Sequence, residues 1–179
     1  KGRQVFDSRG NPTVEAEIFL DDGSSATAIS PSGASTGAFE AHELRDKEQN
    51  KFLGKSVNTA VQNINSKISN KLKNLDFNQQ EKIDKILIEL DGSENKTNLG
   101  ANATLAVSLA YAKCTAIANR QSLYKSLGKS CSLPIPLMNI INGGAHADND
   151  LNIQEFMIRP DSAKNFTDAI EKCFLVIQN

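Results

Sequence analysis

The chain has 179 residues, with 20 Lys and Arg against 21 Asp and Glu, so its formal net charge is −1. Its hydrophobic fraction of 39% and charged fraction of 23% are ordinary for globular domains and exclude a disordered chain. Near-neutral charge gives no reason to expect nucleic acid or an anionic membrane as a partner, and the length is too short for a complete (β/α)8 barrel of about 250 residues.

The cysteine pattern fits a reducing compartment, and the apolar runs are too short for a membrane span. Cys114, Cys131 and Cys173 are widely spaced and odd in number, so neither a disulfide framework nor a structural zinc site is expected. The longest apolar stretch, residues 105–118, is interrupted by polar residues and is shorter than the roughly 18 apolar residues that suggest a membrane span. The first residues show no signal-peptide pattern. We therefore expect a cytoplasmic protein without a membrane span.

The N-terminal part of the chain predicts an antiparallel meander of three strands. Residues 5–7 form the end of the first strand. The next strand, over residues 13–20, is predicted to be half-buried from the alternation of four apolar residues, Val14, Ala16, Ile18 and Leu20. Asp22 and Gly23 are a strong hairpin signal, so residues 24–30 are expected to return as the third strand.

Helical periodicity begins after this meander. One long amphipathic helix is predicted from the face Val57, Ala60, Val61, Ile64, Ile68 and Leu72. A second, with Ile83, Ile86, Leu87 and Leu90 on one face, is expected to begin at a capping box of Asp76 and Gln79 and to end at Gly92. A third, over residues 101–119, is apolar on most sides and is therefore expected in the middle of a bundle. Residues 122–127 add a short helical turn.

The pattern changes at Pro134 and Pro136, and we expect a domain boundary within residues 129–133. Beyond it the sequence predicts a strand at 137–141, a glycine-containing loop, a strand at 153–158 and a helix at 163–177. A strand–strand–helix unit of this size cannot easily bury both faces of its sheet. We expect it to be the beginning of a larger domain.

A run of small residues follows the predicted meander: Ser32, Gly33, Ala34, Ser35, Thr36 and Gly37. These residues are too small to form a core element, so the run predicts a mobile loop. It is not a Walker A loop, because no Lys-Ser/Thr pair follows Gly37, and its spacing is not GxGxxG. The oxygens of Ser35 and Thr36 suit a hard cation or a phosphate. A flexible connector without a ligand remains the alternative.

The loop between the last two predicted strands contains His146, close to Gly143 and Gly144. A lone loop histidine is more often exposed or structural, although the glycines favour the approach of a ligand. Gln154 and Glu155 fall within the following apolar strand, where neighbouring residues point to opposite faces, so one of them is expected to face inward. Glu155 is then either a structural ion-pair member or a tuned acid or base.

Several longer blocks of sequence occur in order along essentially the whole chain and resemble those of the enolase family, in its bacterial version. The blocks are Asp7-Ser8-Arg9-Gly10-Asn11-Pro12-Thr13-Val14-Glu15, Ser32-Gly33-Ala34-Ser35-Thr36-Gly37, Glu43-Leu44-Arg45-Asp46, Leu90-Asp91-Gly92-Ser93-Glu94-Asn95-Lys96, Leu99-Gly100-Ala101-Asn102-Ala103, Asn142-Gly143-Gly144-Ala145-His146-Ala147 and Gln154-Glu155-Phe156-Met157-Ile158.

The resemblance implies an α+β N-terminal domain over residues 1–130, with a three-stranded antiparallel meander followed by helices. Residues 131–179 would be the truncated beginning of a C-terminal (β/α)8-type barrel, comprising its first strands and helix. The implied activity is that of phosphopyruvate hydratase, a glycolytic and gluconeogenic carbon–oxygen lyase. It dehydrates 2-phosphoglycerate reversibly to phosphoenolpyruvate with two Mg2+ ions per active site, and it forms a homodimer or a higher homo-oligomer.

The resemblance also implies roles for individual residues. Ser35 would bind the second Mg2+ as the Ser32–Gly37 loop closes over substrate. His146, Gln154 and Glu155 would bind the substrate. Glu155 would also belong to the carboxylate pair that assists departure of the 3-hydroxyl, so that His146 and Glu155 form the catalytic part of this chain. Glu15 would join an intersubunit ion pair.

The resemblance leaves other parts of the machinery outside this chain. The base lysine and the main metal-binding carboxylates would lie beyond residue 179, so this polypeptide alone is expected to be inactive. The alternative function is an interaction or scaffold module that binds host or RNA-processing partners, with secondary display at the cell surface.

Overall fold

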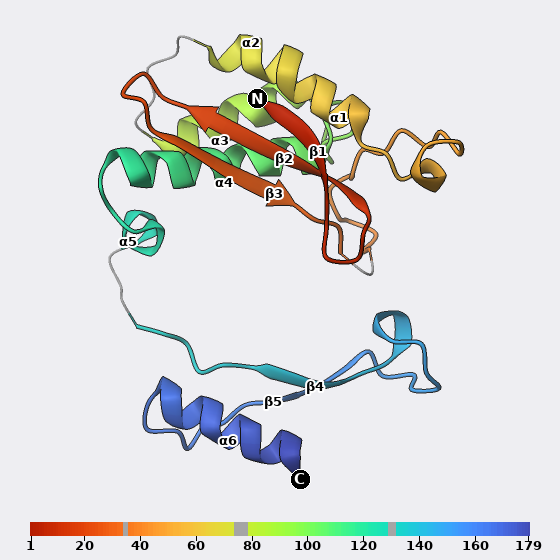
Figure 1. The fold of residues 1–179 in the computed structure, drawn as a ribbon, viewed down its shortest axis with the longest axis vertical. Helices are drawn as coiled ribbons and strands as arrows, with labels where there is room; N and C mark the ends of the chain where they lie inside the picture. Colours follow the sequence, from red (N-terminus) through yellow and green to blue (C-terminus); the bar gives the residue numbers. More distant parts are fainter. Residues whose placement is uncertain (34–35, 74–78, 129–131) are drawn as a thin grey trace. The chain divides into compact units, whose positions relative to one another are not determined.

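The computed structural model describes residues 1–33, 36–73, 79–128 and 132–179. It divides into two compact units, both drawn in Figure 1. The first comprises residues 1–33 and 37–129, and the second is built mainly from residues 130–179. No helix within the described ranges is long and apolar enough to cross a membrane.

The first unit opens with the predicted meander. Strands β1 (Gly2–Phe6), β2 (Pro12–Phe19) and β3 (Ser25–Ser30) form one antiparallel sheet in the order β1-β2-β3. Val14 pairs with Gln4 on one side and with Ser30 on the other, and both Val14 and Ala16 are completely buried. The alternation predicted for β2 is confirmed at Val14 and Ala16 but not at Thr13, which is also buried. The first strand ends at Phe6, one residue before its predicted end.

The long helix predicted over residues 57–72 forms, but it contains a π-helical turn. It consists of α1 (Asn58–Asn63), the π turn η2 (Ile64–Ile68) and α2 (Ser69–Leu72). The amide of Asn65, within the π turn, bonds both backbone groups of Gly2, with Gly2 N–H donating at 2.7 Å and Gly2 O accepting at 2.9 Å. Gly2 also pairs with Ala16 of β2, so these bonds add a tertiary contact that helical periodicity does not reveal.

The second predicted helix, α3 (Gln80–Asp91), begins later than expected. Its N-cap is Gln79, whose backbone is extended, so Gln79 does not take the helical position that the predicted capping box gave it. Asp76, the other member of the box, lies outside the described residues. At the other end Gly92 has a φ of +69° and its N–H bonds Ile88 O. Gly92 is therefore the left-handed helix stop that the sequence predicted.

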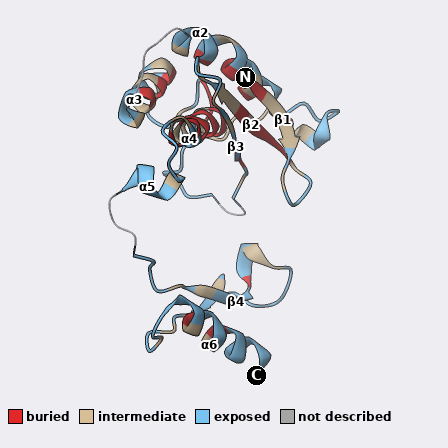
Figure 2. Ribbon diagram, turned by 60° about the vertical axis from the view of Figure 1, so that its left-hand side comes forward, coloured by how far each residue is buried: buried red, intermediate tan, exposed pale blue. Residues whose placement is uncertain are grey.

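Helix α4 (Ala101–Ala118) packs across the sheet, as Figure 2 shows by the buried residues along it. Its contacts include β2, β3, α1 and α3, in agreement with a central position. Leu105, Leu109 and Ile117 are nevertheless exposed, at 50%, 41% and 52%. Within this unit the helix therefore buries one broad face and leaves an apolar stripe uncovered. The short helix α5 (Leu123–Leu127) follows, with Gly128 at its C-cap.

Residues 41–48 form neither helix nor strand and lead into η1 (Phe52–Gly54), a turn with positive φ at all three residues. This segment is held by side chains of neighbouring elements. Asn102, at the start of α4, accepts a bond from Leu44 N–H and donates one to Leu44 O, at 3.2 and 3.0 Å. Asp46 accepts from the N–H groups of Asn58 and Thr59, each at 2.9 Å, so it caps α1 from outside the helix.

The second unit is the predicted strand–strand–helix. Strands β4 (Met138–Asn142) and β5 (Glu155–Ile158) pair antiparallel around the turn η3 (Gly144–His146), and α6 (Phe166–Gln178) follows. Of the predicted helix face, Ala169 and Cys173 are buried, whereas Phe166, Ile170, Phe174 and Ile177 are exposed. The cysteines Cys114 and Cys173 are free and buried, and Cys131 lies outside the described residues.

Candidate active site

Three of the predicted site residues lie together in the second unit. His146 Nδ1 lies 3.0 Å from Glu155 Oε1, and His146 Nε2 lies 3.0 Å from Gln154 Nε2. The imidazole therefore contacts Gln154 through one ring nitrogen and Glu155 through the other. The structure brings together in one cluster three residues that the sequence could place only in a loop and a neighbouring strand.

A pair of glycines determines where this histidine lies. Gly143 N–H donates to Gln154 O at 2.9 Å, and Gly144 N–H donates to Leu151 O at 2.7 Å. Gly144 has a φ of +52°, a conformation that favours glycine, and His146 N–H then closes the turn onto Gly143 O at 3.0 Å. The loop folds back against the chain entering β5, and this brings the His146 ring to the first residue of that strand.

The hydrogen bonds around the ring are consistent with one tautomer of His146 when the Gln154 amide has the orientation seen in the structure. An amide nitrogen donates only, so ring Nε2 accepts from Gln154 Nε2, and the ring proton then sits on Nδ1 and is donated to Glu155 Oε1. Rotating the Gln154 amide by half a turn would present its oxygen to Nε2 and would fit a doubly protonated imidazolium instead. In either arrangement the Gln154 amide and the Glu155 carboxylate bond opposite nitrogens of the imidazole ring.

Of Gln154 and Glu155, one of which was expected to face inward, only Glu155 is partly buried. Strand β5 starts at Glu155, so Gln154 lies before the strand and is exposed. The side chains of His146 and Glu155 keep exposed fractions of 23% and 27%. A partly exposed carboxylate with a histidine partner is open to a ligand from solvent, so the cluster has the access that a substrate site requires.

The small-residue loop is described at both ends. Ser32, Gly33, Thr36 and Gly37 lie within the described residues, whereas Ala34 and Ser35 do not, so the metal role predicted for Ser35 falls outside them. At one end Ser32 Oγ donates to Glu43 Oε1 at 2.5 Å. At the other end Gly37 N–H donates to Glu40 Oε2 at 2.9 Å. Both ends of the loop are thus tied to glutamates of the segment that follows.

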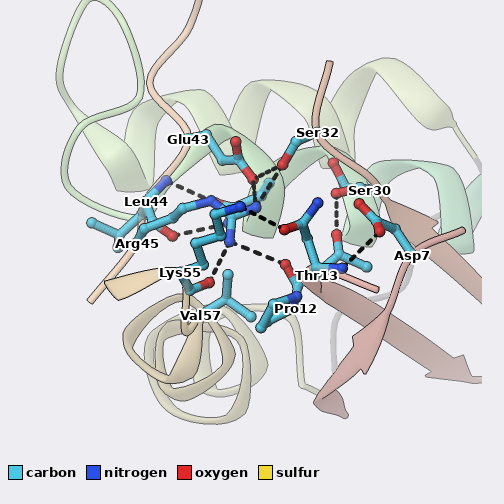
Figure 3. Close-up of polar contacts among 12 residues, drawn as sticks. Asp7, Pro12, Thr13, Ser30, Ser32, Glu43, Leu44, Arg45, Lys55 and Val57 are labelled. Atoms are coloured by element: carbon cyan, nitrogen blue, oxygen red, sulfur yellow. Dashed lines mark hydrogen bonds and ion pairs between the residues drawn. The ribbon is translucent and has the colours of Figure 1, made fainter. Parts of the chain in front are cut away.

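Arg45 and Glu43 are residues of this region whose part sequence reasoning missed. The Arg45 guanidinium donates to Ser32 Oγ at 2.6 Å and to Glu43 Oε1 at 2.7 Å, as Figure 3 shows. It also donates to Pro12 O at 3.1 Å and to Lys55 O. The available signal was the charged block Glu43-Leu44-Arg45-Asp46, which lies close after the small-residue loop.

Glu15, which was predicted to join an intersubunit ion pair, has a partner within the chain. Arg3 lies opposite Glu15 in the β1–β2 register and donates through Nε to Glu15 Oε1 and through Nη2 to Glu17 Oε2, the latter at 2.6 Å. The hydrogen bond and the charge of Glu15, opposed by the partial desolvation of the arginine, raise the pKa of Arg3 above its usual value. The intersubunit role stays a prediction.

The described parts of the chain contain no group of three or more His, Cys, Asp or Glu side chains that could share a metal ion. The carboxylate of Glu155 has the oxygen chemistry that Mg2+ prefers, but its described partners are an imidazole and an amide nitrogen. The cluster around His146 is therefore suited to binding and proton transfer and does not itself fit a Mg2+ site.

Comparison with known proteins accounts for both units. Residues 1–127 match the family model of the enolase N-terminal domain, and residues 130–179 match that of the enolase C-terminal TIM barrel domain. A protein named Enolase from Pelagibacter ubique is 59% identical over 181 residues, an alignment that covers 100% of this chain and 43% of that relative. The chain thus spans less than half the length of the relative it matches. With a three-stranded antiparallel sheet followed by helices, and then the start of a barrel domain, the chain belongs to the enolase family.

Proposed function

We propose that this chain forms part of an enzyme that reversibly dehydrates 2-phosphoglycerate to phosphoenolpyruvate and water. The observation that carries this proposal is the 59% identity to a protein named Enolase across the whole of this chain. The contacts of His146 with Gln154 and Glu155 support it, because they place a carboxylate and a histidine where a ligand can reach them. Neither family match bears on the scaffold alternative.

In this proposal the cluster acts at the leaving hydroxyl. Dehydration removes a proton from C2 and the hydroxyl from C3, and the departing hydroxyl leaves as water once it has gained a proton. Glu155 is assigned to the carboxylate pair that assists this departure. His146 holds the carboxylate through its Nδ1 proton and binds substrate, and Gln154 binds substrate through its amide. The base that takes the C2 proton is assigned to a lysine outside this chain.

The metal requirement is part of the proposal. Two Mg2+ ions, one of them bound by Ser35, would supply positive charge for the anionic intermediate that forms when the C2 proton leaves. The Ser32–Gly37 segment is assigned to substrate closure. We further propose a cytoplasmic homodimer or higher homo-oligomer, with residues 1–130 as the N-terminal domain and residues 131–179 as the first part of the barrel.

The test is phosphoenolpyruvate formation, followed by its ultraviolet absorbance, with the full-length protein, 2-phosphoglycerate and Mg2+. Glu155→Gln keeps the size of the side chain but removes its ability to exchange a proton, so kcat is expected to fall by about 100-fold or more. Asp161→Asn is the matched control, because Asp161 is 60% exposed and pairs with Arg159 instead of with His146. This control is expected to keep wild-type turnover.

Two results would contradict the proposal. A correctly folded full-length protein without turnover of 2-phosphoglycerate would reject the reaction. Equal kcat values for Glu155→Gln and Asp161→Asn would reject the role of Glu155 and leave the reaction standing.

A further inference from the structure

Arg45 is held in place by its own backbone neighbours before its side chain makes any contact. Leu44, the preceding residue, is bonded at N–H and at O by the amide of Asn102. Asp46, the following residue, donates its N–H to Ser56 O at 2.9 Å and accepts bonds from the first turn of α1. The Cα of Arg45 therefore sits between α4 and α1 on a backbone anchored from both sides.

The two terminal nitrogens of the Arg45 guanidinium make bonds in two directions, drawn in Figure 3. Nη1 donates to the carbonyl oxygens of Pro12 and Lys55, and Nη2 donates to Ser32 Oγ and Glu43 Oε1. The two terminal nitrogens carry four N–H bonds, and each has one acceptor. Ser32 in turn donates to Glu43 Oε1, so its hydroxyl both accepts and donates.

The bond from Arg45 to Ser32 fixes the first residue of the Ser32–Gly37 segment. Strand β3 is fixed to its end, because Ser30 pairs with Val14 and accepts a 2.5 Å bond from Thr13 Oγ1. Ser32 is the next anchored residue, and its hydroxyl is held by a guanidinium that is only 18% exposed. A charge-assisted bond to a partly buried arginine is stronger and more directional than a neutral one. Arg45 therefore holds the first residue of the segment, two residues after the end of the strand.

We propose that Arg45 is a positioning residue, which acts through Ser32 to fix the start of the Ser32–Gly37 segment and so determines how tightly the enzyme holds its substrate. This inference rests on the proposed function, which assigns the segment to substrate closure. Lysine cannot replace the arginine, because an ammonium is a compact charge that does not reach four acceptors on two sides.

The experiment compares Arg45→Lys, Ser32→Ala and their combination with Lys55→Met, all in the full-length protein. Lys55→Met is the matched control, because it removes the 2.8 Å bond from Lys55 Nζ to Asn11 Oδ1 and leaves the Lys55 carbonyl that Arg45 uses. Three quantities are measured for each variant: hydrogen–deuterium exchange of a peptide covering residues 31–37, KM and kcat for 2-phosphoglycerate at saturating Mg2+, and the thermal midpoint.

Arg45→Lys and Ser32→Ala are each expected to speed exchange in the 31–37 peptide and to raise KM by about ten- to 100-fold, the equivalent of one charge-assisted hydrogen bond. Because both changes break the same contact, the double variant should be no worse than the more affected single variant. Lys55→Met should leave KM and exchange in this peptide unchanged.

The proposal is overturned if Arg45→Lys lowers the thermal midpoint while KM and exchange stay at the values of Lys55→Met, because Arg45 would then be structural only. Additive effects in the double variant would also overturn it. Hydrogen–deuterium exchange can be measured whether or not the protein dehydrates 2-phosphoglycerate. A full-length protein without hydratase activity would reject the proposed function. In that case faster exchange of the 31–37 peptide in Arg45→Lys would still support the anchoring of Ser32 by Arg45. Unchanged exchange of this peptide would reject the anchoring.

Discussion

Gly143 lies so close to Leu151 that a Cβ at position 143 would stand 2.6 Å from Leu151 Cβ and 2.7 Å from Leu151 O. These distances are shorter than any normal contact of a Cβ atom, and one of the opposing atoms belongs to the backbone. A side chain at this position would therefore push the two arms of the loop apart. Since the same loop carries His146 to Glu155, the contact between Gly143 and Leu151 is a requirement of the candidate active site.

Gly143→Ala is accordingly expected to lower kcat/KM of the full-length protein by about 10- to 100-fold, because misplacing a site residue by about 1 Å has effects of this size. Gly128→Ala is the control, because Gly128 has an extended backbone and a Cβ added there would meet no atom within 4 Å. Steady-state kinetics of the two variants measures the difference. Equal kinetics would show that the loop accommodates the methyl group without moving His146.

The helix stop at Gly92 is expected to matter for stability. Gly92 has a φ of +69°, and an added Cβ would meet only Glu89 O at 3.7 Å, so the cost of Gly92→Ala is backbone strain and not a clash. A loss of about 1 kcal/mol in the free energy of unfolding is expected. Urea unfolding measures it, and Gly128→Ala, in an extended conformation, should change the free energy by less than half of this amount.

Asp91 organises the loop between α3 and α4 and should make stability depend on acid. Burial alone would raise its pKa, but bonds from Ser93, from Leu99 N–H at 2.7 Å and from other groups of the loop outweigh it and lower the pKa below its usual value. Because the folded pKa is lowered, the stabilisation is present above the pKa of an unfolded aspartate, about 3.9, and is lost as the pH falls through the folded pKa.

Asp91→Asn is therefore expected to cost about 2 kcal/mol of unfolding free energy at pH 7, because it removes a charged acceptor of buried N–H groups. The cost should shrink as the pH falls below about 4, where the wild-type carboxylate itself becomes protonated. Urea unfolding of both proteins at pH 7 and at acid pH measures the two differences. A cost that does not change with pH would exclude the ionised carboxylate as its source.

Asp46 should stabilise α1 although it is remote in sequence. Its carboxylate accepts hydrogen bonds from Asn58 N–H and Thr59 N–H. Burial alone would raise the pKa of Asp46, but these bonds and the bond from the Thr59 hydroxyl lower the pKa below its usual value. Asp46→Ala is expected to cost about 1 kcal/mol, as for the loss of an N-cap. Glu48→Ala is the control, because the Glu48–Lys51 pair is about half exposed and such pairs contribute about 0 to 1 kcal/mol. Thermal unfolding of both variants measures the contrast, and equal midpoints would reject the capping role.

Local sequence patterns predicted most of the helices and strands but missed some of their details. The alternation in β2, the hairpin at Asp22, the stop at Gly92 and the span of α4 depend on neighbours in the chain, and all are present. The π turn at Ile64–Ile68 accompanies the bonds of Asn65 to Gly2, and α3 begins without the predicted capping box. The bonds between Asn65 and Gly2 join residues far apart in the sequence, so periodicity could not show them.

For the candidate site, the order of amino acids alone established which chemical groups are present and which family the motifs resemble. It identified His146, Gln154 and Glu155 because each is a polar group in a glycine-rich or apolar context. Only the tertiary structure decided that His146 contacts both of the others and that β5 starts at Glu155. Only the structure, too, revealed that Arg45 joins Pro12, Ser32 and Lys55. The physical reason is that hydrogen bonds form between groups within about 3 Å in space, and chain folding brings such groups together from any separation in sequence.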